Sequence, residues 1–132
     1  TETRLAIQQF ETLFKRWPNS KITAAAQEEY REARDRLSES IYRVGLFYFR
    51  QQWYPGAITR FREVLDDDPR YTYRDAVYYY LARALIRVKQ QAEALPLLDR
   101  LQKEFETSEY LGRAKELAAQ LKSSMEANLK PS

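Results

Sequence analysis

The sequence contains no cysteine and no histidine. Disulfide bonds, thiol nucleophiles and zinc sites built from cysteine or histidine ligands are therefore excluded. Only three glycines and five prolines occur among 132 residues, which leaves little room for the tight turns of a β-protein. No run of about 18 apolar residues is present either, so we expect no segment that spans a membrane.

Apolar and charged residues are both plentiful. Hydrophobic residues make up 44% of the chain and charged residues 31%, a balance typical of a folded, soluble domain and not of a disordered segment. The net charge is +3, and lysines and arginines alternate with acids along the chain. This alternation is typical of solvated helix faces and argues against a nucleic-acid-binding surface.

One apolar phrase nearly recurs along the chain. It is Ala6-Ile7-x-x-Phe10-x-x-Leu13 before Trp17-Pro18, then Ala57-Ile58-x-x-Phe61-x-x-Val64 before Asp68-Pro69, and then Ala94-Leu95-x-x-Leu98-x-x-Leu101. Repeated helical phrases of this kind indicate an α-solenoid, whose units bury their apolar faces against their neighbours. Solenoids usually present surfaces to partners, so the pattern favours a binding scaffold over an enzyme.

Prolines and turn residues divide the chain into about six helices. We expect them over residues 2–16, 23–51, 55–65, 73–89, 92–105 and 108–126. Thr23 and Ser108 are the expected caps of the second and the last helix. We expect Pro96 in the first turn or so of the fifth helix, where its missing N–H costs little. We expect the third helix to end before the acids 66–68, because acids at a helix C-terminus oppose the macrodipole.

The apolar register fits the tetratricopeptide template. The matching positions are Ile41, Val44, Gly45, Tyr48, Tyr54, Ala57, Phe61, Val64 and Pro69. Gly45 and Ala57 are the small residues that would let two helices approach closely. The predicted fold is therefore all-α: a tetratricopeptide-type solenoid forming one domain over residues 1–132, with repeats near 38–71 and 75–108 and a capping helix over 108–126.

The second helix is predicted to be about twice the usual length. Its core stripe steps by three and four through Tyr30, Ala33, Leu37, Ile41, Val44 and Tyr48. Ala6 and Ala57 are 51 residues apart, whereas Ala57 and Ala94 are 37 apart. The extra 14 residues make almost four whole turns, so the stripe stays on one face and the helix projects beyond its neighbours. In the first helix we expect Leu5, Phe10, Leu13 and Phe14 to be buried.

Several of these segments resemble one family. Arg34-Asp35-Arg36-Leu37, Val44-Gly45-x-x-Tyr48 and Trp53-Tyr54-x-x-Ala57-Ile58-x-Arg60-Phe61 resemble the BamD (YfiO) outer-membrane assembly lipoproteins, as do Phe14-x-x-Trp17-Pro18-Asn19-Ser20 and Asp75-Ala76-x-Tyr78-x-x-Leu81. The resemblance runs from about Ala6 to Leu121 and corresponds to the C-terminal half of such a protein, cut inside a helical array.

The resemblance carries several implications. The protein would be lipid-anchored at the periplasmic face of the bacterial outer membrane, through an anchor outside this chain. It would be a non-catalytic subunit of the machine that folds β-barrel proteins, with its C-terminal half docked on a periplasmic domain of BamA. Its partners would be proteins, with no nucleic acid and no cofactor.

The residues themselves indicate no catalytic constellation. Glu28, Glu29 and the acids 66–68 lie on polar faces or in a turn, without a histidine or a glycine-rich phosphate loop. The acid triplet lacks the alternating ligand spacing of a calcium loop. We therefore expect no enzyme, no metal site and a plain solvated turn at 66–68.

The candidate partner-binding residues are aromatic, aliphatic and arginine side chains on two helices. On the long helix and the turn after it, Tyr42, Leu46, Phe49 and Trp53 form a second apolar stripe, and Arg36, Arg43 and Arg50 recur every seven residues. The whole candidate set is Tyr42, Arg43, Leu46, Phe49, Arg50, Trp53, Tyr79, Arg83 and Arg87. The alternatives are packing within the chain for the stripe and i, i+4 pairing with Glu32 and Glu39 for the arginines.

Two other functions remain open at this point. One is another periplasmic tetratricopeptide protein, such as a cell-envelope or division coordinator of the YbgF type. The other is a peptide-binding co-chaperone in which Arg83 and Arg87 grip a C-terminal carboxylate.

Overall fold

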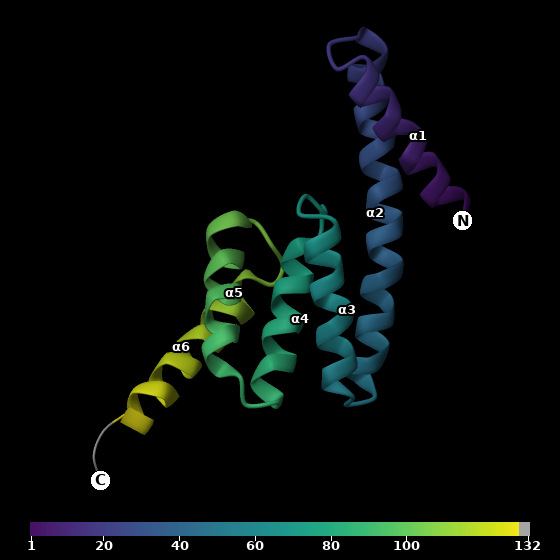
Figure 1. Ribbon diagram of the computed structural model, residues 1–132. Coiled ribbons are helices and arrows are strands. Elements are labelled where there is room, and N and C mark those ends of the chain that lie inside the picture. The colour runs from purple at the N-terminus through teal and green to yellow at the C-terminus, as the bar shows by residue number, and fades with distance from the viewer. Residues whose placement is uncertain (130–132) are drawn as a thin grey trace.

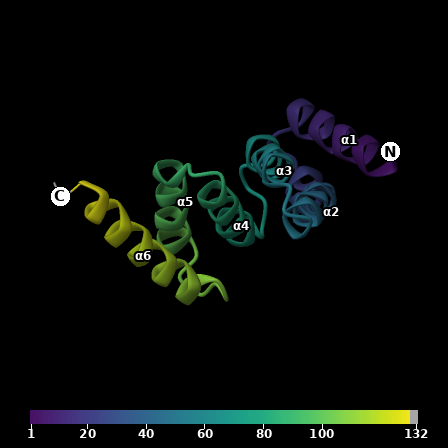
Figure 2. The ribbon, with the colours of Figure 1, turned by 90° about the horizontal axis from the view of Figure 1, so that it is seen from below.

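The computed structural model describes residues 1–129, which fold into six α-helices and no strand (Figure 1). They are α1 (Glu2–Arg16), α2 (Lys21–Arg50), α3 (Tyr54–Asp67), α4 (Arg74–Arg87), α5 (Gln91–Glu104) and α6 (Leu111–Leu129). Each helix packs against the next, with α1, α3 and α5 toward one side and α2, α4 and α6 toward the other (Figure 2). The predicted all-α tetratricopeptide-type solenoid is confirmed.

The long helix is also confirmed. Helix α2 has 30 residues, or about 45 Å at 1.5 Å per residue. Its N-terminal part and α1 extend beyond α3 and the rest of the array (Figure 1). Three rings hold this projecting pair together: Phe14 and Phe10 from α1 lie with their centroids 5.1 and 6.1 Å from that of Tyr30.

The core lies between α2 and α6, with α3, α4 and α5 at its centre. Its largest fully buried side chains are Tyr71, Tyr78, Phe61, Leu85, Leu98, Leu101, Val64 and Val77. Gly45 on α2 is needed for the close approach to α3, because a Cβ atom there would lie 2.6 Å from the Phe61 ring. Ala57 is likewise fully buried. Both small residues therefore have the role that the sequence pattern predicts.

The acid triplet is not the plain solvated turn that we expected. Helix α3 continues through Asp66 to Asp67, and the Asp68 side chain is buried. Asp68 accepts hydrogen bonds from the buried Ser38 hydroxyl at 2.7 Å and from the Arg31 guanidinium. Arg34 donates to the Asp67 carbonyl. These two arginines from α2 compensate the helix C-terminus, so the helix includes acids that would otherwise oppose its dipole.

Two predicted caps are wrong. The N-cap of α2 is Ser20, whose hydroxyl accepts from the Ile22 N–H at 3.1 Å. Thr23 is buried inside the helix and donates to the Trp17 carbonyl at 2.6 Å, so it anchors the preceding turn. Helix α6 begins at Leu111, three residues after Ser108.

Three other expectations, two about burial and one about a proline, are wrong. Leu5 and Val44, which we expected in the core, are 55% and 39% exposed. Pro96 lies inside α5 and not in its first turn.

Candidate protein interface

The nine candidate residues fall on two different surfaces. Tyr42, Leu46 and Phe49 face α4 and are half-buried against the core. The Tyr42 ring lies 5.8 Å from the ring of Phe61, and the Phe49 ring lies 5.4 Å from that of Tyr80. Burial, followed by the neighbouring Tyr110 and Tyr80, raises the pKa of Tyr42. The second apolar stripe therefore packs within the chain over these three residues.

The candidates on α4 meet this stripe. Tyr79 is buried, whereas Arg83 is half-buried and Arg87 is exposed. The Arg83 guanidinium lies 5.0 Å from the centroid of the Phe49 ring, and that of Arg87 lies 5.2 Å from the centroid of Tyr54. A hollow of about 270 Å³ opens between the helices here, lined by Phe49, Tyr54, Arg83, Ile86, Arg87 and Leu117. We call these six residues the groove.

Arg43, Arg50 and Trp53 do not line the groove. Trp53 is 53% exposed, and its ring packs edge-on against Tyr48 with a centroid separation of 4.7 Å. Phe47 is 58% exposed, and the centroid of its ring lies 5.9 Å from that of Tyr48. Val44, which is 39% exposed, precedes Phe47 and Tyr48 by three and four residues on α2, so its side chain neighbours both at the C-terminal end of the helix. We call Arg43, Val44, Phe47, Arg50 and Trp53 the outer-end surface.

The position of α1 accounts for this exposure. Residues at the start of α1 approach α2 near Leu37 and Ser40, where they line a shared hollow. Val44 and Phe47 follow Ser40 at steps of four and seven, which places them on the same face of the helix. Helix α1 covers this face of α2 up to about Ser40. After Ser40, no part of residues 1–129 covers it in the same way. The apolar pattern predicts Val44 in the core, and Phe47 belongs to neither of the two predicted stripes. The signal for Phe47 was a third apolar face on one helix.

The arginine ladder on α2 is paired at one of its three members. Arg43 forms an ion pair with Glu39, with a nitrogen–oxygen distance of 3.0 Å. Within the described residues, Arg36 and Arg50 form no ion pair. The i, i+4 alternative therefore accounts for Arg43 and leaves Arg50 as an unpaired cation one helical turn after the exposed Phe47.

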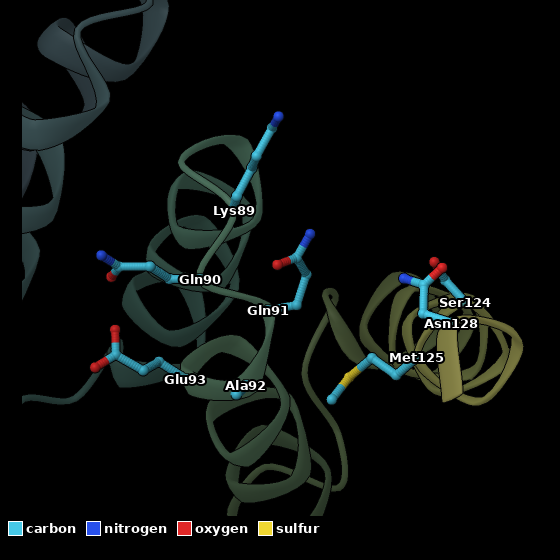
Figure 3. Close-up of a pocket in the computed structure, with 8 residues that line it drawn as sticks. All are labelled: Lys89, Gln90, Gln91, Ala92, Glu93, Ser124, Met125 and Asn128. Atoms are coloured by element: carbon cyan, nitrogen blue, oxygen red, sulfur yellow. The ribbon is translucent and has the colours of Figure 1, made fainter. Parts of the chain in front are cut away.

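Metal sites, membrane-spanning helices and polar clefts are the other features of residues 1–129 that bear on function. In that range no three acidic side chains are grouped so as to hold a metal ion. The helices there all lack the combination of length and apolar character needed to cross a membrane. A hollow of about 500 Å³ lies between the α4–α5 turn and α6, but Gln90 and Glu93 point away from Ser124 and Asn128 across it (Figure 3). Its polar groups therefore do not converge on one point.

Comparison with known proteins gives a family for this architecture. The family model described as "YfiO: Outer membrane lipoprotein" matches residues 1–95, which include α1 to α4 and the start of α5. Comparison with curated proteins gives no significant match. The matched range includes the long helix and the whole outer-end surface, and it covers well over half of the chain. The chain therefore belongs to the YfiO (BamD) family of outer membrane lipoproteins.

Proposed function

We propose that this chain is a non-catalytic protein-interaction scaffold of the outer-membrane β-barrel assembly machine, and that it docks on a periplasmic domain of BamA. In this proposal the full-length protein is held at the periplasmic face of the outer membrane by a lipid anchor, and its working partners are proteins. The family assignment supports the location, and the outer-end surface supports the docking role.

The observation that carries the proposal is the outer-end surface. Phe47 and Trp53 are each more than half exposed, although large aromatic side chains usually gain about 1.5–3 kcal/mol from full burial. Exposed apolar patches with arginine at their edge are typical of binding sites, where aromatic and arginine side chains provide most of the affinity. Arg50 supplies an unpaired guanidinium whose fork can bind a carboxylate through two hydrogen bonds. The surface fits an apolar partner patch flanked by acids.

The test is calorimetric binding of this chain to the periplasmic domains of BamA from the same organism. We expect micromolar or tighter binding, and a loss of at least about tenfold for Arg50→Glu, because reversal turns attraction of an acid into repulsion. The matched control is Lys115→Glu on the exposed side of α6, which makes the same change of charge away from α2. It should bind as the unmodified chain does.

Two results would count against the proposal. Absence of binding by a chain shown to be helical by circular dichroism would remove the BamA assignment. Equal losses for Arg50→Glu and Lys115→Glu would mean that net charge, and not the outer-end surface, governs the interaction.

A further inference from the structure

The groove between α2, α4 and α6 carries a charge arrangement that the proposed docking on BamA does not use. Its lining residues do not include Arg43, Arg50 or Trp53. Three arginines lie in or beside it: Arg83 and Arg87 on α4 and Arg113 on α6. Within residues 1–129 none of the three forms an ion pair with an acidic side chain.

Aromatic rings hold these guanidinium groups in place. Arg83 lies over the rings of Phe49, Tyr79 and Tyr80 at 5.0, 5.5 and 5.7 Å. Arg113 lies over Tyr110 at 4.6 Å and over Tyr79 at 5.3 Å, so it shares a ring with Arg83.

Arg87 lies one helical turn after Arg83 on α4, over the Tyr54 ring. We call Arg113, Arg83 and Arg87 the arginine row. Stacking on rings restrains an arginine before a ligand arrives and leaves its N–H edge free to bind a carboxylate.

The spacing of the row indicates the shape of the ligand. Arg83 and Arg87 are four residues apart on α4, a rise of about 6 Å. In an extended chain, side chains two residues apart lie on one face and about 6.7 Å apart. Acidic side chains at alternate positions of an extended segment therefore match the row. A third acid further along the same face would reach Arg113.

The hollow beside the row adds an apolar requirement. Phe49, Ile86 and Leu117 contribute apolar walls to its volume of about 270 Å³. A cavity of about 150 Å³ holds a benzene molecule, so this one admits an aliphatic or aromatic side chain. A ligand that fills the groove combines carboxylates with at least one apolar side chain.

From these observations we propose that the groove binds a short, extended acidic segment of a partner protein, with carboxylates at alternate positions and one apolar anchor. The row of three unpaired arginines favours side-chain carboxylates over a chain terminus, which offers a single α-carboxylate. The proposal rests on the chain being a binding scaffold, and it does not depend on BamA being the partner.

The experiment measures fluorescence anisotropy of a short labelled peptide blocked at both ends, with three glutamates at alternate positions and one leucine. We expect saturable binding, and a loss of at least about tenfold when glutamine replaces the glutamates, since charge-assisted bonds are about twice as strong as neutral ones. Arg87→Gln should weaken binding as well, and because Arg87 is exposed the change should leave the fold intact. Arg62→Gln on α3, in the opposite row of helices, is the control and should leave binding unchanged.

Further arms separate the possible outcomes. A preference for a peptide with a free C-terminal carboxylate and no glutamates would replace the acidic segment with a chain terminus. Equal binding of the glutamate and glutamine peptides, no binding up to millimolar peptide, or full binding by Arg83→Gln/Arg87→Gln would each overturn the proposal. Retained peptide binding by Arg50→Glu would show that the peptide site does not depend on Arg50, the residue on which the proposed docking on BamA depends.

Discussion

Asp68 offers the sharpest test of how the long helix is joined to the array. Its carboxylate is 3% exposed and accepts from Ser38 and Arg31, while Arg34 lies 3.9 Å away. Replacing Asp68 with alanine leaves the buried Ser38 hydroxyl without its partner, at a cost of about 1–3 kcal/mol. Arg31 and Arg34 keep some exposure to water, so each lost ion pair adds only about 0.5–1 kcal/mol.

We therefore expect Asp68→Ala to lower the free energy of unfolding by about 3 kcal/mol. Asp68→Asn should cost about half as much, because the amide oxygen can still accept from Ser38 while the ion pairs are lost. The assay is urea unfolding followed by circular dichroism. The control is Asp66→Asn, which removes an exposed acid from the same turn and should change stability by less than about 0.5 kcal/mol. A loss below about 1 kcal/mol for Asp68→Ala would refute the assigned role.

Three further predictions use the same unfolding assay. Gly45→Ala should destabilise the chain by about 1–3 kcal/mol, because the new Cβ atom would collide with the buried Phe61 ring. The control, Gly112→Ala, meets open space and should be neutral or stabilising. The reverse order of the two stabilities would contradict the packing. Trp53→Ala should cost about 1 kcal/mol, the value of its ring pair, and a loss near 4 kcal/mol would place Trp53 in the core. Burial, with Tyr80 and Glu109 nearby, raises the pKa of Tyr110 to about 12, so the folded state holds this proton more tightly than the unfolded state does. The resulting stability is complete below pH 10 and is lost as the pH rises toward 12; Tyr110→Phe should reduce this loss, and an unchanged pH profile would contradict it.

Local patterns were sufficient to predict most of the fold. Apolar steps of three and four located all six helices, and their ends lie within about three residues of the expected positions. The length of α2 followed from the spacing of Ala6, Ala57 and Ala94. The close approach at Gly45 followed from its place in the tetratricopeptide register. These features depend on neighbours in sequence, which is why the sequence alone could show them.

The failure at the acid triplet concerns contacts between residues far apart in sequence. The burial of Asp68 depends on Arg31 and Ser38, which lie 37 and 30 residues earlier. A charge count at one helix end cannot reveal arginines that arrive from another helix. Thr23 failed as a cap for a local reason, because its hydroxyl donates to the Trp17 carbonyl six residues earlier and Ser20 caps the helix.

The candidate site was anticipated in composition but not in arrangement. Periodicity found the residue types, yet it placed Trp53 and Phe49 on one stripe, whereas the turn after Arg50 separates them. Gln52 in that turn has a φ of 61°, in the left-handed region, and this local change of direction is not visible in the apolar pattern. Arg113 was missed because its role beside Arg83 depends on how α6 packs on α4.

The most direct test of the central claim is photo-crosslinking in living cells, with a photoreactive amino acid placed in the full-length protein. At the position of Trp53 the account predicts a crosslink to BamA. At Ala24, an exposed position near the other end of α2, it predicts none. A crosslink to BamA from Ala24 but not from Trp53, or from neither, would contradict docking through the outer-end surface.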